Sequence, residues 1–188
     1  KGKVSIGPGT LLLATGITLA SNVNIEGSGM GKTVLKHSGT TLHSMITGAS
    51  KDDWILSDLT IDGDQTGVST YNADRWQREQ AVELSTCTDF VIRDVEITAS
   101  RGQCIHGSTC TRGTVEGCWI HDADNWGAVF SVATDIDFFY NHVEAVYTHG
   151  LYAAPNVSAS GSNRVRFSGN TVIGVLNDVT HTDSGVGI

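Results

Sequence analysis

The chain has 188 residues, 39% of them apolar, and 20 acidic against 12 basic side chains give it a formal net charge of −8. This size predicts a single domain over residues 1–188. The negative charge, with no basic stripe, argues against nucleic-acid binding. Because no apolar run reaches about 18 residues and no signal-peptide pattern is visible, we expect no membrane span.

The N-terminal part of the sequence predicts short strands separated by turns. Residues 3–6, 11–14, 17–19, 23–25 and 33–36 are short runs separated by turn residues such as Pro8-Gly9, a pattern typical of strands. The glycine-rich run 27–33 imitates a phosphate-binding loop. However, Glu26 stands where the Walker pattern requires glycine, and a strand follows instead of a helix. We therefore predict a tight corner between strands and no nucleotide site.

A repeat occupies the middle of the chain. Residues 85–88 read Ser-Thr-Cys-Thr, and the same four residues return 23 positions later at 108–111. A fixed period of this length, made of short alternating runs, indicates a solenoid of strands. We predict an all-β, right-handed, single-stranded parallel β-helix of about seven rungs, with equivalent residues about 4.8 Å apart. The predicted equivalent inward positions are Ile25, Leu56, Ile92, Val115, Phe138 and Phe167.

The four cysteines fit this repeat. Cys87 and Cys110 are expected on neighbouring rungs, close enough in principle for a disulfide. Cys104 and Cys118 fall at inward positions, where a free thiol behaves as a small apolar group. Four packing thiols are the better interpretation, because no metal-binding spacing occurs.

Two further patterns concern the turns and the ends of the predicted solenoid. Asn141 and Asn170 take an inward slot that Val95 and Cys118 hold on other rungs, which predicts a ladder of asparagines at a turn. The sequence begins and stops inside predicted strands, at residues 3–6 and 186–188. Because solenoids need polar caps, we expect both ends of a longer protein to be missing.

Two N-terminal runs carry a family resemblance. Residues 22–36, Asn-Val-Asn-Ile-Glu-Gly-Ser-Gly-Met-Gly-Lys-Thr-Val-Leu-Lys, and 58–64, Asp-Leu-Thr-Ile-Asp-Gly-Asp, resemble the opening rungs of pectate-lyase-like β-helix proteins. That group includes mannuronan C5-epimerases, polysaccharide lyases and phage tailspikes. The resemblance implies action on a polysaccharide along one sheet, and a homotrimer if the protein is a spike. The epimerase motif Tyr-Gly-Phe-Asp-Pro-His is absent near residues 103–107, and only His149-Gly150 is similar to the family's catalytic His-Gly.

One outward face is predicted to carry the functional residues. Glu83 and His106 lie 23 residues apart beside inward-pointing Val82 and Ile105, so they should be neighbours on successive rungs. Loops 62–80, 98–102, 121–127 and 144–150 enter the same sheet, and function concentrates on loops held by a rigid frame. Aromatic and charged side chains there suit sugar rings and hydroxyls. The predicted substrate-binding residues are Trp76, Arg78, Trp126, Tyr147 and Tyr152.

Carboxylates on this face leave two kinds of site open. A glycosidase needs two carboxyl groups roughly 5–10 Å apart, and Glu83 with Asp124 or Asp64 is the candidate pair. Alternatively, Asp122 and Asp124 could hold Ca²⁺ through hard oxygen ligands, although an Asp-rich turn has the same pattern.

Histidines on the same face suit a different chemistry. A lyase or epimerase needs a base near the C5 proton of a uronate and a cation for its carboxylate. His106 or His149 could be the base and Arg101 the cation. The simplest structural explanation for Glu83 and His106 is a surface ion pair contributing about 0–1 kcal/mol.

Two functions therefore stand as hypotheses. The first is an extracellular, cell-surface or virion-borne protein that acts on a polysaccharide, an anionic one included, as a lyase, epimerase or depolymerase. The second is a non-catalytic β-helix that serves as a structural stalk, an adhesin or a glycan-binding module. The clustered His, Asp, Arg and Trp residues favour the first, and the absent epimerase motif favours the second.

Overall fold

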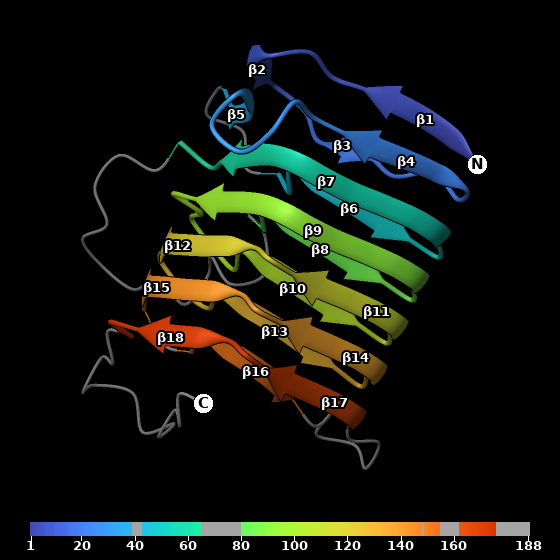
Figure 1. Cartoon of the computed structure of the whole chain (residues 1–188), viewed down its shortest axis with the longest axis vertical. Coiled ribbons are helices and arrows are strands. Elements are labelled where there is room, and N and C mark those ends of the chain that lie inside the picture. The colour runs from blue at the N-terminus through green and yellow to red at the C-terminus, as the bar shows by residue number, and fades with distance from the viewer. Residues whose placement is uncertain (39–42, 65–79, 148, 155–161, 176–188) are drawn as a thin grey trace.

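The computed structural model describes residues 1–38, 43–64, 80–147, 149–154 and 162–175. In these ranges all regular structure is strand, and every strand pairing is parallel. The chain winds through seven successive turns from the N-terminal end, blue in Figure 1, to β17 and β18, red in the same view. The predicted right-handed parallel β-helix is confirmed. No helix among the described residues is long and apolar enough to cross a membrane.

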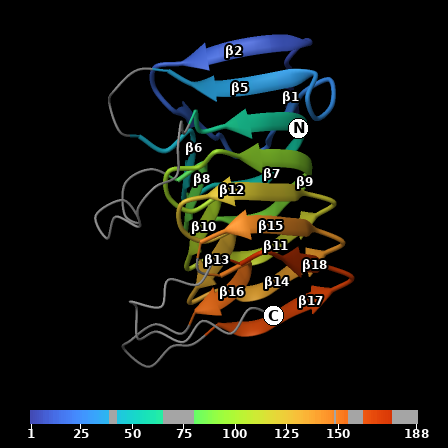
Figure 2. The ribbon, with the colours of Figure 1, turned by 90° about the vertical axis from the view of Figure 1, so that its left-hand side faces the viewer.

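Three stacks of strands make up the walls of the solenoid (Figures 1 and 2). Stack 1 contains β1 (Gly2–Ser5), β4 (Val23–Glu26), the first halves of β7 (Asp52–Asp62) and β9 (Thr88–Thr98), β11 (Thr111–Glu116), β14 (Thr134–Phe139) and β17 (Asn163–Ser168). Stack 2 contains β2 (Gly9–Leu13), β5 (Thr33–His37), the second halves of β7 and β9, β12 (Trp119–Ala123), β15 (His142–Val146) and β18 (Thr171–Ile173). Stack 3 contains β3 (Ile17–Thr18), β6 (Ile46–Ala49), β8 (Val82–Ser85), β10 (Ile105–Ser108), β13 (Ala128–Ser131) and β16 (Leu151–Ala154).

The register of stack 1 follows the repeat in the sequence. Adjacent strands pair so that the six predicted equivalent positions form one column, in the order Ile25, Leu56, Ile92, Val115, Phe138 and Phe167. All but Phe167, which lies in the last described turn, are buried. The predicted inward positions and their register are therefore confirmed.

Large and small residues alternate inside the solenoid. The Trp54 and Phe90 rings stack with centroids 5.1 Å apart, and the next position in that column is Gly113. A Cβ atom on Gly113 would lie 2.1 Å from Phe90, so only glycine fits beneath the ring. Gly107 faces Phe130 in the same way, with a distance of 2.2 Å. Close packing of this kind fixes how the turns sit on one another.

The bend between stacks 1 and 2 depends on left-handed backbone conformations. Asp58 and Asp94 have φ of 58° and 51° at this bend, and Gly117, Tyr140 and Gly169 take the same role in later turns. Asp and Gly tolerate this region better than most residues. Asp58 and Asp94 therefore have a structural role at this bend.

The predicted asparagine ladder lies directly after this bend. Asn141 is buried; its Nδ2 donates to the Val115 carbonyl at 2.9 Å and to Asn170 Oδ1 at 3.0 Å. Its Oδ1 accepts from the Cys118 backbone N–H at 3.0 Å. The side chain thereby satisfies backbone groups that the turn leaves without strand partners.

The other turn and cysteine predictions can also be compared with the structure. Thr33 Oγ1 accepts from the Ser28 N–H at 2.9 Å and donates to the Gly7 carbonyl at 2.9 Å, which makes residues 27–33 the predicted tight corner. All four cysteines are free and buried, as packing thiols should be. Cys87 and Cys110 lie on neighbouring turns, where the Thr111 N–H donates to the Cys87 carbonyl at 2.9 Å.

Candidate functional site

The outward positions of stack 3 form one column along most of the solenoid, in which Val129 is buried. Register pairs place these residues side by side, in the order Thr18, Thr47, Glu83, His106, Val129 and Tyr152. Glu83 and His106 are direct partners in neighbouring strands, as the repeat predicts. Equivalent residues on adjacent parallel strands lie about 4.8 Å apart, so the carboxylate and the imidazole can act on the same bound group.

Glu83 lies at a hollow in this face. The hollow has a volume of about 320 Å³, which falls in the range of small-molecule sites. The Ser44 hydroxyl donates to Glu83 Oε2 at 2.6 Å and holds the carboxylate in place. The hollow is lined by Thr18, Thr47, Gly48, Ala49, Lys51, Glu83 and Ser85.

Lys51 is the cation that the sequence analysis missed in this hollow. The residue follows β6 at the turn into β7 and is half-buried. Sequence reasoning assigned the cationic role to Arg101, because Arg101 stands in a variable loop. Lys51 stands in a short connection with no chemical signature, and only the packing of β6 beside β8 shows that it shares a hollow with Glu83.

Burial makes His106 a candidate proton acceptor. The loss of solvent around the ring lowers the pKa of His106, and the neighbouring Glu83 carboxylate opposes this effect in part. An imidazole with a lowered pKa is neutral at neutral pH and carries a free lone pair. His106 can therefore act as a general base.

Three predicted residues gather at the far end of the same face. The His149 and Tyr152 rings stack at 4.7 Å, and the Trp126 ring meets both edge-on, at 5.5 Å from His149 and 5.8 Å from Tyr152. Trp126 precedes β13, His149 precedes β16, and Tyr152 belongs to β16. Aromatic rings with polar edges suit the faces of sugar rings. Tyr147 lies nearby after β15, and its N–H donates to the Asn125 carbonyl at 2.9 Å.

The three aspartates proposed for catalysis or Ca²⁺ binding lie in unlike surroundings. Asp124 is only 5% exposed, and its N–H donates to the Ser100 carbonyl at 3.0 Å. Asp122 is exposed on β12, where its Oδ2 lies 2.7 Å from His121 Nδ1. Asp64 lies 2.7 Å from Lys36 Nζ, and this partner lowers the pKa of Asp64. No three His, Cys, Asp or Glu side chains converge on a metal position in the described ranges, so Asp122 and Asp124 gain no third ligand there.

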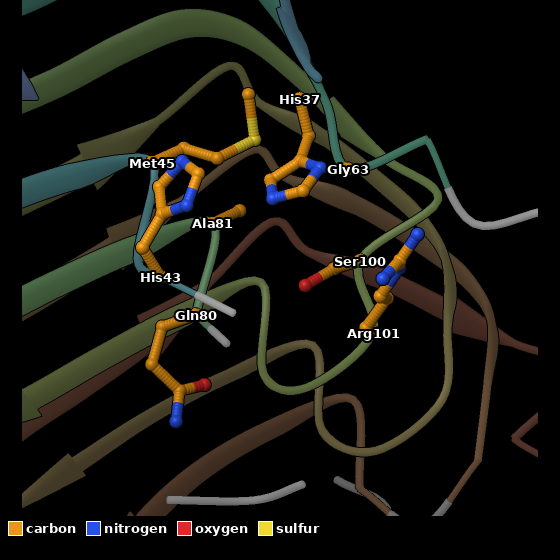
Figure 3. Close-up of a pocket in the computed structure, with 8 residues that line it drawn as sticks. All are labelled: His37, His43, Met45, Gly63, Gln80, Ala81, Ser100 and Arg101. Carbon is orange, nitrogen blue, oxygen red and sulfur yellow. The ribbon is translucent and has the colours of Figure 1, made fainter. Parts of the chain in front are cut away.

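Arg101 belongs to a narrow pocket between stacks 2 and 3 (Figure 3). The imidazoles of His37 and His43, whose centroids are 4.5 Å apart, stack in this pocket. The free space is about 10 Å³, which suits one water molecule and excludes a sugar ring. The lining residues are His37, His43, Met45, Gly63, Gln80, Ala81, Ser100 and Arg101.

No sequence signal could have paired His37 with His43. His37 ends β5 and His43 lies shortly before β6, and neither residue belongs to the 23-residue repeat. Trp76 and Arg78, also proposed as substrate-binding residues, lie outside the described residues.

Comparisons with known proteins find similarity of fold alone. No protein-family model matches the sequence, and no curated protein is similar to it. Similar solved structures include the tailspike protein gp49 of Acinetobacter baumannii bacteriophage Fri1, a capsular polysaccharide depolymerase (TM-score 0.70, 14% identity, 94% of this chain and 36% of that one). ORF18 of Geobacillus virus E2 is also similar, with a TM-score of 0.67 and 18% identity over 90% of this chain and 33% of that one. The A-module of the Azotobacter vinelandii mannuronan C-5 epimerase AlgE6 has a TM-score of 0.65 and 16% identity over 94% of this chain and 59% of that one.

These likenesses define the class of fold. The chain has the right-handed parallel β-helix fold of the pectate-lyase-like proteins, as the N-terminal resemblance implied. It spans between about a third and three fifths of the length of those three proteins. At such low identity the agreement concerns the backbone, so function has to be argued from the side chains of this chain.

Proposed function

We propose that this protein binds a polysaccharide along the outward face of stack 3 and breaks or modifies it beside Glu83 and His106. The observation that carries the proposal is the direct pairing of these two residues next to a hollow of about 320 Å³. Trp126, His149 and Tyr152 extend the same face by a set of rings on which further sugar units can stack. Polysaccharide-active and virion proteins among the structural neighbours support an extracellular or virion location.

The side chains favour proton abstraction over hydrolysis. The described outward column of stack 3 contains one carboxylate, Glu83, whereas a glycosidase needs two flanking the bond. Asp124 is buried and Asp64 is paired with Lys36, so neither is a ready partner.

A uronate bound in the hollow would meet a suitable set of groups. Lys51 would hold the sugar carboxylate, which makes the C5 proton more acidic. Neutral His106 would accept that proton. The C5–H electron pair would form the C4=C5 double bond as the C4–O bond breaks, and the departing oxygen would take up a proton. Return of a proton to C5 from the opposite face, without cleavage, would give the epimer.

Glycan binding without chemistry is the second candidate function. It is favoured by the single carboxylate of the column and by the aromatic cluster, which needs no reacting group to hold a sugar. In this case Glu83 and Lys51 would orient the glycan through charged hydrogen bonds, and the protein would serve as a recognition module of a spike or a surface layer.

A panel of polysaccharides tests both candidates. Alginate, polygalacturonate and neutral capsular glycans are incubated with the protein, and products are followed by the ultraviolet absorbance of unsaturated uronates, by reducing ends and by NMR for epimers. We expect His106→Ala to lower the rate by about 10²- to 10⁴-fold. Arg112→Ala, at an exposed position on stack 1, is the control that keeps full activity.

Binding measurements separate the candidates. If no polysaccharide is altered but one binds, and Trp126→Ala weakens that binding, the non-catalytic function holds and the enzymatic one is wrong. If the protein neither alters nor binds any member of the panel, both are wrong.

A further inference from the structure

Trp119 is a large aromatic side chain on the outside of the solenoid, on a different stack from the face described above. It starts β12 in stack 2, points outward and is 40% exposed. Its indole Nε1 donates to Glu144 Oε1 at 3.0 Å, and its ring stacks on His121 at 4.2 Å with an interplanar angle of 26°. The ring is thus fixed in one orientation before any ligand arrives, which reduces the entropy lost on binding.

The groups beside this ring are held in position as well. His121 Nε2 lies 3.3 Å from Glu96 Oε1, and His121 Nδ1 lies 2.7 Å from Asp122 Oδ2. Thr60 Oγ1, in the preceding turn of the solenoid, donates to Glu96 Oε2 at 2.6 Å. The hydrogen bonds therefore connect β7, β9 and β12, and they set the plane of the His121 ring that supports Trp119.

The Trp119 patch, defined as Glu96, Trp119, His121, Asp122 and Glu144, has a consistent chemical character. Three of its members are carboxylates, and the hydrogen bond from Trp119 followed by that from His142 lowers the pKa of Glu144, which keeps this carboxylate ionised. Carboxylates accept strong hydrogen bonds from hydroxyl groups and repel anions. A flat indole beside them packs against the apolar face of a pyranose ring.

We propose that the Trp119 patch is a second glycan-binding site, which takes a neutral sugar residue with free hydroxyl groups. The indole provides the stacking surface, and Glu96, Asp122 and Glu144 accept hydrogen bonds from the hydroxyls. The site lies on stack 2, so it is separate from the Glu83 and His106 face of stack 3 and does not depend on the function proposed for that face. It would hold a glycan to the flank of the solenoid.

NMR of the indole N–H groups tests this site directly. The protein has four tryptophans, and a Trp119→Phe variant assigns the Trp119 signal. The protein is titrated with neutral gluco-, manno- and galacto-oligosaccharides and, separately, with oligogalacturonate. We expect at least one neutral oligosaccharide to shift the Trp119 signal, oligogalacturonate to leave it in place, and the signal of fully buried Trp54 to stay unchanged throughout. Trp119→Ala should weaken binding of the active oligosaccharide roughly tenfold or more.

Variants of the other face distinguish the two sites. Trp126→Ala should leave the Trp119 shift intact, because Trp126 belongs to the cluster on stack 3. The proposal is wrong if no neutral oligosaccharide moves the Trp119 signal, if oligogalacturonate moves it more than the neutral sugars do, or if Trp126→Ala abolishes the shift. Loss of activity on stack 3 leaves the Trp119 result unaffected, so the two proposals can fail independently.

Discussion

His106 is an outward-facing residue with a lowered pKa. It lies on the outward side of β10 as the register partner of Glu83, and the packing around it still removes enough water to lower its pKa. Glu83 acts in the opposite direction, because a carboxylate favours the charged imidazolium. Burial has the larger effect, so the residue is held in the neutral form in which it can accept a proton.

Lowering the pH should therefore destabilise the fold through His106. An unfolded histidine titrates near pH 6.5, and the folded one titrates at lower pH, so between these values the unfolded state binds more protons. The contribution to stability is complete above about pH 6.5 and is lost as the pH falls through the folded pKa. We expect His106→Gln to reduce the slope of unfolding free energy against pH between about pH 7 and pH 5, measured by urea denaturation.

The control for this prediction is Arg112→Ala, at an exposed position of β11 whose guanidinium stays charged over this pH range. It should leave the slope as in the unchanged protein. An unaltered slope in His106→Gln would mean that burial does not control this histidine, and the general-base role would lose its physical basis.

Each element of the solenoid is fixed by contacts with the turn before and the turn after it. On the outer side of stack 1, Arg112 forms a two-pronged ion pair with Asp89 on the preceding turn, with both N–O distances at 2.6 Å. Such exposed pairs contribute little to stability, because solvent screens them, and mainly favour the correct register. The bend between stacks 1 and 2 depends instead on buried hydrogen bonds. The loss of these bonds would lower the unfolding free energy by more than the loss of an exposed ion pair.

The bend should be sensitive to loss of the Asn141 amide. Asn141→Leu keeps a side chain of similar size but leaves the Val115 carbonyl and the Cys118 N–H without the bonds they make at 2.9 and 3.0 Å. We expect a loss of about 2–6 kcal/mol in unfolding free energy, because each of the two buried unsatisfied groups costs about 1–3 kcal/mol. Urea denaturation monitored by circular dichroism measures the change.

Asn170→Leu is the matched comparison one turn later, where the side chain is partly exposed. Its cost should be smaller, because water can replace part of the lost bonding. Equal costs for the two variants, or a neutral Asn141→Leu, would show that the ladder does not stabilise the bend.

At the scale of the whole molecule, the core is one continuous column of side chains sealed by the three stacks. All four thiols lie inside it. Burial raises the pKa of Cys118 to about 12 and raises that of Cys104 as well, while the hydrogen bond with Cys87, together with burial, raises the pKa of Cys110. A reagent can reach such groups only after part of the solenoid opens.

Thiol labelling measures the integrity of this core. We expect Ellman's reagent to react with none of the cysteines in the native protein within the mixing time and with all four after denaturation in guanidinium. A count of two after denaturation without reductant would reveal a disulfide between Cys87 and Cys110. Rapid labelling of the folded protein would contradict a closed core.

The parallel β-helix, the column from Ile25 to Phe167 and the pairing of Glu83 with His106 could all be predicted from the amino-acid sequence. These features follow from a 23-residue repeat combined with an alternation of period two, which together define both the register and the side of the wall each residue faces. The asparagine ladder was predictable for the same reason.

The residues that surround the site could not be predicted in this way, because they come together only in the folded chain. The burial of Asp124, the place of Arg101 beside His37 and the presence of Lys51 near Glu83 depend on how connections of unequal length cross between stacks. No periodicity governs those paths. The hydrogen bond from Trp119 to Glu144 joins residues that are not register partners, because Trp119 pairs with His142, two positions before Glu144. Its prediction would need the path of the backbone through stack 2 as well as the repeat.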